Sequence, residues 1–319
     1  MHGGGSGDCM TKKIAVQMDA IHLLNFTTDS TISLIKEAQR RGFSVYCYRP
    51  EEMFMANSKI YARCSGIKIT DSEYTLSTSV TVCLDEFDVI LMRQDPPFNI
   101  NYITATYLLE KVSPKTIIVN NPAAVRNSPE KLLICDYSQF MPPTLITQDL
   151  ANAEEFFVQY KQVVLKPLHA FGGIDVSLVD NIQELRKIFS QILEKYGTYL
   201  EVQKFLPEVR LGDKRIILIN GKPVGAINRI PAASSIKANL AAGATAHATV
   251  ITKRELEICE VVGDELKRRG IVIAGIDVIG DYITEINVTC PTGFNAINRL
   301  YDLQGDKTIE ALAWDGILR

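Results

Sequence analysis

The residues of this sequence best suited to bind a metal ion are Asp277, Glu285 and Asn287, which flank a short turn pattern. Side chains alternate between the two faces of a strand, so residues of one parity can share a face. Two carboxylates that face each other across a sheet repel unless a cation joins them. Carboxylate and amide oxygens are hard ligands that suit Mg²⁺, together with phosphate oxygens and water. From the spacing alone, a magnesium site and a solvated polar face on an edge hairpin both remain open.

The register of this hairpin decides whether the carboxylates meet. A three-residue connection, Gly280-Asp281-Tyr282, puts Asp277 directly across from Glu285. A two-residue connection would put Asp277 across from Thr284 and separate the two carboxylates between faces. The apolar residues favour the first register, because it also pairs two isoleucines on one buried face.

A second group of residues could bind phosphate. Lys166 ends a strand pattern, and the turn that follows contains Gly172 and Gly173. A cation and free backbone N–H groups could therefore surround phosphate oxygens, although the spacing is not that of a P-loop and a Gly-Gly turn is more often an ordinary hairpin. Residues 201–206 form a strand pattern that could line an adenine ring, and Asp213 begins the next strand. Each pattern is weak alone, and only their order along the chain discriminates.

The elements that must position these residues begin with an alternation of strands and helices. Short apolar runs predict strands at 14–18, 43–48, 89–92 and 116–119. Helical spacing predicts helices at 30–41, with Asp29 as N-cap, and at 103–111. Such alternation predicts a parallel sheet covered by helices.

The pattern changes near residue 121. Residues 216–219 and 222–227 flank Asn220-Gly221, which predicts an antiparallel hairpin. Residues 231–248 are almost all Ala, Ser, Asn, Gly and Thr and carry no core pattern. This composition predicts a mobile active-site loop within a folded domain, with a disordered surface insertion as the alternative.

The composition indicates a protein of about two domains. The 319 residues are 46% hydrophobic and 22% charged, and the net charge of -3 argues against a general binder of nucleic acid or membrane surfaces. No apolar run is long enough to span a bilayer. The seven scattered cysteines and four dispersed histidines favour reduced thiols in the cytoplasm over a disulfide framework or a zinc site. The glycine-rich N-terminus lacks the apolar core of a signal peptide.

The order of the motifs resembles that of the ATP-grasp superfamily and, within it, the bacterial glutathione synthetases. The shared order is Lys131, then Leu165-Lys166-Pro167 with its glycine loop, then 203–206, and finally Asp277 with Glu285-Ile286-Asn287. Further matching segments are 18–19, 37–42, 89–98, 212–215, 229–231, 239–243 and 284–289. The matches extend from Lys12 to about Arg299 and so cover nearly the whole chain.

This resemblance implies an α/β fold in which an N-terminal parallel-sheet (pre-ATP-grasp) domain precedes ATP-grasp α+β domains. Residues 1–11 would be a flexible leader or a cloning remnant, and residues 12–122 the N-terminal α/β substrate-binding domain. The ATP-grasp region would occupy residues 123–319. It would comprise a small subdomain at about 129–206 and a C-terminal catalytic subdomain at 207–319, with the mobile lid at 231–248.

The resemblance also implies roles for individual residues. The metal ligands would be Asp277, Glu285 and Asn287, and the catalytic residues Arg215, Arg229 and Lys166. The ATP-binding residues would be Lys131, Lys166, Gly172, Gly173, Gln203, Lys204, Phe205, Leu206 and Asp213. The substrate-binding residues would be Arg93, Asp95, Arg229, Lys237, Asn239, Cys290, Pro291, Thr292 and Gly293.

The implied reaction joins γ-L-glutamyl-L-cysteine to glycine and gives glutathione, ADP and phosphate. ATP, as co-substrate, would phosphorylate the cysteinyl carboxylate, and the glycine amine would then displace phosphate. Mg²⁺ is the expected metal, with Mn²⁺ as a substitute, and the family's form is a homo-oligomer, a tetramer. The expected partners are small molecules, with no nucleic acid and no membrane. No covalent nucleophile is needed.

Two alternatives remain. One is an ATP-grasp ligase with other substrates, of the D-alanine–D-alanine or glutamate-adding type, against which the segments 93–98 and 239–243 argue. The other is a non-catalytic nucleotide-binding scaffold, which the presence of both lysines and all three metal positions disfavours.

Four places depart from the family's usual pattern. Gln94 replaces a more typical lysine, and His169-Ala170-Phe171 makes the glycine loop less rich in glycine. Lys237 stands where the lid often carries an arginine, and lysine lacks the planar bidentate fork. Gly293-Phe294-Asn295 replaces a more polar run. These changes concern lid motion and contacts to the peptide substrate, rather than the ATP chemistry.

Overall fold

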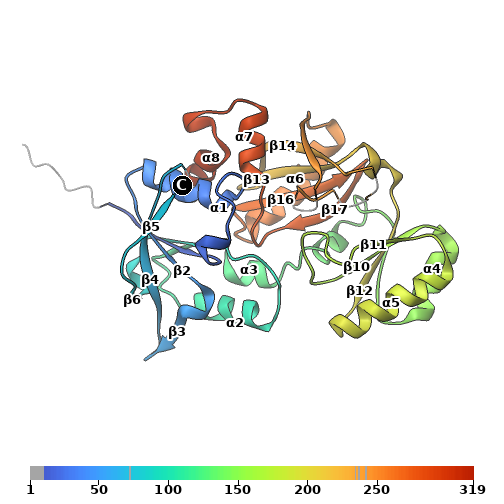
Figure 1. Cartoon of the computed structure of the whole chain (residues 1–319), viewed down its shortest axis with the longest axis horizontal. Helices are drawn as coiled ribbons and strands as arrows, with labels where there is room; N and C mark the ends of the chain where they lie inside the picture. The colour runs from blue at the N-terminus through green and yellow to red at the C-terminus, as the bar shows by residue number, and fades with distance from the viewer. Residues whose placement is uncertain (1–10, 72, 234, 236–237, 241–242) are drawn as a thin grey trace, which may run out of the picture.

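The computed structural model describes residues 11–71, 73–233, 235, 238–240 and 243–319. Its three sheets lie in a row, with the N-terminal sheet at one end, the four-stranded sheet at the other and the five-stranded sheet between them (Figure 1). The expected leader falls almost wholly on residues 1–10, and the expected lid residue Lys237 is also outside the described residues. No helix in the described part of the chain has both the length and the hydropathy to cross a bilayer.

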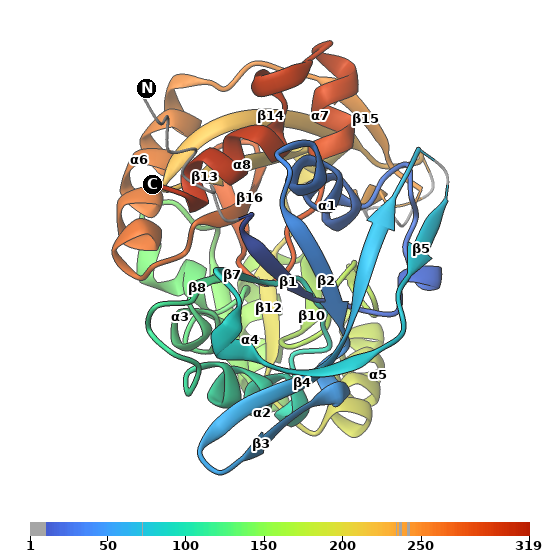
Figure 2. The ribbon, with the colours of Figure 1, turned by 90° about the vertical axis from the view of Figure 1, so that its left-hand side faces the viewer.

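The N-terminal sheet has a parallel centre, as the sequence predicts. Its strands run in the order β3-β4-β2-β1-β7-β8, and β5 and β6 pair with β4. The pairs β1–β2, β1–β7 and β7–β8 are parallel. Residues 53–83, for which the sequence pattern made no prediction, add antiparallel strands to one side (Figure 2). The strands are β1 (Lys13–Gln17), β2 (Ser44–Tyr48), β3 (Met53–Ala56), β4 (Lys59–Ile69), β5 (Tyr74–Leu76), β6 (Val80–Cys83), β7 (Val89–Met92) and β8 (Ile117–Val119).

Side-chain caps fix the starts of the helices in this part. The Asp29 carboxylate accepts a hydrogen bond from Thr31 N, which confirms the predicted N-cap of α1 (Ser30–Arg40). Asn99 caps α2 (Ile100–Leu109) in the same way, so this helix begins three residues earlier than predicted. The remaining elements are α3 (Pro122–Arg126) and the 3₁₀ turns η1 (Ile21–Leu23), η2 (Pro50–Glu52) and η3 (Leu84–Glu86).

The four-stranded sheet has a core of its own. Its strands, in the order β11-β10-β12-β9, are antiparallel and pack against two helices through Phe157, Leu165, Phe189 and Val202. The elements are β9 (Thr144–Thr147), α4 (Leu150–Tyr160), β10 (Val163–Pro167), β11 (Ser177–Val179), α5 (Ile182–Tyr196) and β12 (Leu200–Lys204).

The five-stranded sheet runs in the order β15-β14-β13-β16-β17 and carries both predicted hairpins. The first turns at Asn220 and Gly221, whose φ values of 48° and 77° are those that an Asn-Gly hairpin turn requires. The last four residues of the expected lid form the edge strand β15 rather than loop. The elements are η5 (Pro207–Leu211), β13 (Asp213–Ile219), β14 (Lys222–Ile230), β15 (Thr245–Ala248), α6 (Lys253–Arg268), β16 (Ile273–Ile279), β17 (Tyr282–Asn287), α7 (Phe294–Leu300), η7 (Gly305–Lys307) and α8 (Ile309–Ile317).

The N-terminal and five-stranded sheets share two continuous cores. Ile14 and Val16 face the same cluster as Ile217 and Trp314, whereas Ala15 and Ile90 face the cluster that contains Ile216 and Ile276. The Trp314 indole donates a hydrogen bond to Leu34 O at 2.9 Å and so ties α8 to α1. These two sheets therefore form one packed body, and the four-stranded sheet is attached to it.

The segment before the four-stranded sheet packs against the five-stranded one. Residues 129–141, expected at the start of the small subdomain, contain the 3₁₀ turn η4 (Leu133–Tyr137). Glu130 O accepts a hydrogen bond from Ile286 N at 3.2 Å, and Phe140 O accepts one from Ile283 N at 2.8 Å. This segment therefore covers the free edge of β17 and brings Lys131 next to the carboxylate hairpin.

Candidate active site

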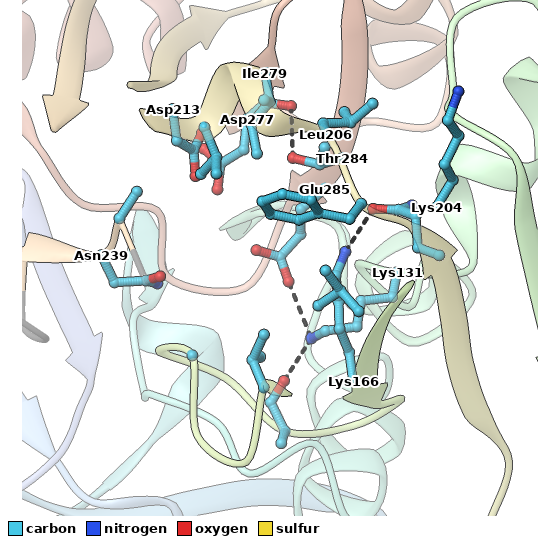
Figure 3. A pocket seen from close by; sticks show the side chains of 18 of the residues that line it. Lys131, Lys166, Lys204, Leu206, Asp213, Asn239, Asp277, Ile279, Thr284 and Glu285 are labelled. Atoms are coloured by element: carbon cyan, nitrogen blue, oxygen red, sulfur yellow. Dashed lines mark hydrogen bonds and ion pairs between the residues drawn. The ribbon is translucent and has the colours of Figure 1, made fainter. Parts of the chain in front are cut away.

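A cleft lies between the four-stranded and the five-stranded sheet. The residues that line it come from the segment before β9, from β10 and the loop after it, from β12, and from β13, β16 and β17 (Figure 3). The predicted residues on its walls are Lys131, Lys166, Gly173, Gln203, Lys204, Phe205, Leu206, Asp213, Asn239, Asp277 and Glu285. Patterns that are dispersed over 155 positions of sequence therefore meet in one cavity.

The predicted register of the carboxylate hairpin is confirmed, but the predicted three-residue connection is wrong. Ile279 pairs with Tyr282, so only Gly280 and Asp281 form the turn. A β-bulge then shifts the register, with the result that Asp277 lies opposite Glu285 and Thr284 is the extra residue. The bulge allows a two-residue turn and still places the two carboxylates on one face. The alternation of apolar and polar residues in the sequence cannot distinguish such a bulge from a longer loop.

Asp277 is buried and held by two arginines. Arg215 donates to both of its carboxylate oxygens, from Nη2 at 2.9 Å, and Arg229 Nη2 lies 3.0 Å from Oδ2. Burial by itself raises the pKa of Asp277, but Arg215 and Arg229 outweigh burial and hold this pKa well below its usual range. The carboxylate is therefore ionised at neutral pH.

Asp213 shares Arg229 with Asp277. Arg229 Nη2 lies 2.8 Å from Asp213 Oδ2, while Asp213 Oδ1 is buried without a hydrogen-bond partner among the described residues. Burial, opposed by Arg229, raises the pKa of Asp213 to about 6. The oxygen without a partner gives the cleft an acceptor for a ligand hydroxyl or amine.

Lys131 bridges Glu285 and the glycine loop. Its Nζ lies 3.0 Å from Glu285 Oε1 and donates to Ala170 O at 2.6 Å (Figure 3). Burial lowers the pKa of Lys131, but Glu285 and Glu130 outweigh it and the net direction is upward. A phosphate that approaches this ammonium therefore replaces contacts that already exist.

Lys166 is anchored on the neighbouring strand. Its Nζ donates to Glu201 Oε1 at 3.0 Å and to Gln203 Oε1 at 2.9 Å. Glu201 is fully buried, and β10 pairs with β12 so that Lys166 lies opposite it. The loop after β10 turns through Gly172 and Gly173, both at positive φ, and of the two only Gly173 lines the cleft.

The three predicted metal ligands offer a donor set that fits Mg²⁺. The Asn287 amide donates to Asp277 Oδ2 at 3.3 Å, which leaves the Asn287 carbonyl oxygen as an acceptor on the same face. No cluster of three or more His, Cys, Asp or Glu side chains suited to a metal occurs among the described residues. Mg²⁺ commonly binds to only a few protein ligands, such as two carboxylates and one amide, and phosphate oxygens and water complete its coordination sphere.

A second cluster gathers several predicted substrate residues at the carboxyl end of β7. Arg93, buried in this cluster, donates to Pro291 O at 3.1 Å and to Thr31 Oγ1 at 3.2 Å, and the Cys290 thiol donates to Arg93 O at 3.2 Å. Asp95 N donates to Asp19 Oδ2 at 2.7 Å. Burial, partly opposed by Cys290 and Arg93, raises the pKa of Asp95.

The other predicted substrate residues lie elsewhere. Asn239 lines the cleft between the two sheets rather than this cluster. Thr292 O accepts a hydrogen bond from Arg215 Nη1 at 3.3 Å, and Gly293 is the N-cap of α7 at φ 118°. These two residues connect the cluster around Arg93 to the arginine that holds Asp277.

Three residues with a bearing on the site, the half-buried Glu130 and the buried Asn120 and Thr289, were missed by the sequence patterns. Glu130 accepts a hydrogen bond from Thr289 Oγ1 at 2.7 Å, beside Glu285. The Asn120 amide donates to Ile273 O and Val288 O and accepts from two backbone N–H groups. Their signals were slight: an acid next to a predicted lysine, a threonine behind the metal motif, and an asparagine after a parallel strand.

Family models match both halves of the chain. Residues 12–126 match the model described as "Prokaryotic glutathione synthetase, N-terminal domain". Residues 130–302 match the one described as "Prokaryotic glutathione synthetase, ATP-grasp domain".

Curated relatives match over nearly the full length. The chain is 43% identical to "Glutathione synthetase" of Mesorhizobium japonicum, over 97% of this chain and 98% of the relative. It is 44% identical to "Glutathione synthetase" of Rhodopseudomonas palustris, again over 97% and 98%.

Solved structures share the fold at low identity. The D-cycloserine synthetase DcsG is 13% identical, with a TM-score of 0.68 over 96% of this chain and 98% of that one. The D-alanyl-alanine synthetase A of Vibrio cholerae is 12% identical, with a TM-score of 0.61 over 97% and 99%. At such identities the likeness concerns the ATP-grasp architecture alone.

Proposed function

Because this chain belongs to the prokaryotic glutathione synthetase family and therefore catalyses the ATP-dependent formation of glutathione, we propose that its two clusters are the two halves of one ligase site. The cleft between the sheets binds Mg·ATP, and the cluster around Arg93 binds γ-glutamylcysteine. The single observation that carries this assignment is that Asp277, Glu285, Lys131 and Lys166 line one cavity.

The nucleotide half uses charge that is already in position. Lys131 and Lys166 bind the phosphates, with the backbone of Gly173 close by, while β12 and Leu206 line the adenine pocket. The side chain of Lys204 lies over the ring of Tyr160, 5.9 Å from its centroid, so its contribution to the cleft is backbone. Asp213, with one buried oxygen that has no partner, accepts from a ribose hydroxyl.

Asp277, Glu285 and Asn287 would hold Mg²⁺, which would supply positive charge that neutralises the phosphates and aligns the transferred group. Mn²⁺, a second hard divalent ion, would fit the same ligands. When ATP enters, Lys131 exchanges its contacts with Glu285 and Ala170 O for phosphate oxygens and so frees Glu285. Arg215 and Arg229 keep Asp277 ionised and stabilise negative charge that develops during transfer.

The reaction has two steps. The cysteinyl carboxylate attacks the γ-phosphorus, an O–P bond forms, the bond to ADP breaks, and ADP leaves with the electron pair. The glycine amine then attacks the acyl carbon, a C–N bond forms, the C–O bond to phosphate breaks, and the amine loses its proton. Burial of Arg93, Arg215 and Arg229 suits this chemistry, because preorganised cations act strongly where water is excluded.

One assay tests the substrate pair. ADP release and glutathione formation are measured with γ-glutamylcysteine plus glycine, with D-alanine, and with no acceptor. We expect one ADP per glutathione and little release otherwise. Equal ADP release with D-alanine would contradict the proposed substrates and favour a ligase with other substrates. No ADP release with any acceptor would favour the non-catalytic scaffold.

We further propose that the chain acts in the cytoplasm as a homotetramer with small-molecule partners only. The cysteines that the structure describes are free thiols, as in reducing compartments. Light scattering should give a mass near four times the 35.5 kDa of the chain. A mass near 35.5 kDa at micromolar concentration would rule the tetramer out.

A further inference from the structure

The glycine loop, residues 168–176 between β10 and β11, is fixed from behind by the end of α5. Asp175 Oδ2 accepts hydrogen bonds from Lys195 Nζ and from the Tyr196 hydroxyl, both at 2.6 Å. Lys195 and Tyr196 belong to the last turn of α5, which packs against the four-stranded sheet (Figure 1). The roles assigned above do not use these three residues.

The contact at Asp175 lies on the side of the loop that faces away from the cleft. Residues 173–174 and Val176 line the cleft between the sheets. Asp175, between them in sequence, instead lines a surface groove beside α5 that Lys195 also lines. Lys195 and Tyr196 are not among the described residues that line the cleft, so they affect a nucleotide there only through the loop.

The backbone of the loop needs such support. Gly172 and Gly173 form a turn at positive φ, closed by a hydrogen bond of 3.1 Å from Ile174 N to Phe171 O. Asp175 follows at φ 55°, in the left-handed region that a residue other than glycine adopts at an energetic cost. Such a residue keeps its conformation only where its surroundings hold it. The two hydrogen bonds to the Asp175 side chain do so here.

The protonation states of the two donors suit this contact at neutral pH. The hydrogen bond to Asp175 raises the pKa of Lys195, and burial together with the bond to Asp175 raises the pKa of Tyr196. Lys195 is therefore charged and Tyr196 keeps its hydroxyl proton. The Lys195 side chain is 60% exposed, so solvent weakens its ion pair, and the bond from the partly buried Tyr196 hydroxyl to a carboxylate contributes more.

We propose that Asp175 is a positioning residue for ATP, which holds the glycine loop in its phosphate-binding shape through Lys195 and Tyr196. The inference rests on the proposed function, which places the phosphates close to the backbone of Gly173. A loop that already has this shape binds ATP more tightly, because only the molecules with a competent loop can bind.

The loop is also held on the side of the cleft, but that contact does not last. Lys131 donates to Ala170 O at 2.6 Å, and the proposed function has Lys131 give up this bond when it turns to phosphate. The contact at Asp175 lies outside the cleft and persists. It therefore fixes the loop while the nucleotide is bound.

The first experiment removes the partners of Asp175 and leaves the loop sequence unchanged. In the double variant Lys195→Gln/Tyr196→Phe, the KM for ATP should rise about tenfold, since a loop that is competent in about one molecule in ten binds that much more weakly. The kcat at saturating ATP and the KM for γ-glutamylcysteine should stay within about twofold, because bound ATP itself orders the loop. Arg186→Gln, which breaks an exposed ion pair between α5 and Glu154, is the matched control and should leave all three constants unchanged.

Single variants separate the hydroxyl from the charge. Tyr196→Phe removes only the hydroxyl and should give most of the rise in the KM for ATP. Asp175→Asn still accepts from the hydroxyl and tolerates positive φ, so its KM for ATP should stay within about threefold of wild type. An unchanged KM for ATP in the double variant, or a fall in kcat with no change in this KM, would overturn the positioning role.

Hydrogen exchange tests the loop without catalysis. In the free wild-type protein the amides of residues 170–176 should exchange about tenfold more slowly than in the double variant, and Mg·ATP should remove the difference. Equal exchange in the two free proteins would overturn the positioning role without touching the proposed function, since no nucleotide is present there. If Mg·ATP protected the loop in neither protein, the proposed nucleotide site would be wrong, and the positioning role with it.

Discussion

At the residue scale, the distinctive feature of the site is that its candidate metal ligands are already neutralised. Asp277 carries contacts from Arg215 and Arg229, and Glu285 carries one from Lys131. Without these cations, two carboxylates at cross-strand distance would destabilise the hairpin. We propose that the same cations bind phosphate when ATP enters, so that the free cleft is stable and substrate binding needs only an exchange of partners.

The metal role predicts a strong loss of turnover in two isosteric variants. Asp277→Asn and Glu285→Gln should each lower kcat by about 100-fold or more at saturating Mg²⁺, because each removes a charge that orients the transferring phosphoryl group. Steady-state glutathione formation measures the effect, and thermal melting reports the fold. Asp281→Asn, in the exposed turn of the same hairpin, is the control. Near-normal turnover of both folded variants would end the metal assignment.

The buried hydrogen bonds of Asn120 predict that replacing this residue lowers the stability of the protein rather than its catalytic activity. Its buried amide makes hydrogen bonds of 2.7 to 2.9 Å to the backbone at the start of β16 and the end of β17. Asn120→Ala leaves these backbone groups without hydrogen-bond partners and should lower the unfolding free energy by about 3 kcal/mol or more. Urea unfolding measures this change, with Asn101→Ala on an exposed helical surface as control. A change below about 1 kcal/mol would show that water replaces the amide.

At the scale of elements, the lid segment is tethered at both ends. Arg210 donates to Ala233 O at 3.2 Å and to Ser235 O at 2.9 Å, and at the other end Tyr301 accepts from Thr249 N at 2.7 Å. With its last residues in the edge strand β15, the stretch free to move is shorter than residues 231–248. We propose that it closes over the acyl phosphate and excludes water.

If residues 231–248 close over bound substrates, the rate at which trypsin cleaves this segment should depend on whether substrates are present. Residues 231–248 contain one trypsin site, at Lys237. Limited trypsin treatment of the free protein should cut there, and Mg·ATP with γ-glutamylcysteine should slow the cut several-fold. Lys237→Gln is the control for the assignment of the fragments by mass. Equal rates of cleavage with and without substrates would refute gating.

At the scale of the whole molecule, the division of the cores predicts which parts move. The N-terminal and five-stranded sheets share two cores, whereas the four-stranded sheet has a separate one. The nucleotide cleft lies at the junction of the separate core with the rest. We propose that the cleft closes by motion of the four-stranded sheet with α4 and α5, since the other two sheets cannot separate without exposing apolar area.

The contact between the two ends of the chain predicts a pH-dependent stability. Buried Glu37 bonds Arg40 and Arg41 on α1, and Arg41 Nη1 lies 2.8 Å from Asp315 on α8. Burial acts to raise the pKa of Glu37, but Arg40 and Arg41 outweigh it and hold the pKa below 4.5. This stabilisation is full above pH 4.5 and is lost as the pH falls through the lowered pKa of the folded state.

Glu37→Gln should therefore lower the unfolding free energy by about 1 to 3 kcal/mol at pH 7, and the difference from wild type should shrink as the pH falls below 4.5. Urea unfolding at several pH values measures it, with exposed Glu86→Gln as the control. A difference that stays constant down to the acid transition would contradict the linkage.

The sequence by itself determined the elements whose signals are local. Asp29 and Asn220-Gly221 each fix a helix start or a turn through their own backbone conformation, and the parity of Ile276 and Ile286 fixes one face of a sheet. The collinear motifs determined the family, because residues that bind a shared ligand recur in a fixed order even when they are far apart.

Only the tertiary structure decided which residues meet. The bulge that aligns Asp277 with Glu285 depends on how β16 and β17 pair, and parity cannot reveal it. The partnership of Lys131 with Glu285, and the place of Glu130 beside Thr289, arise because the segment before β9 returns to cover the edge of β17. Such contacts join residues more than 150 positions apart, and their energy comes from packing and charge that no local pattern encodes.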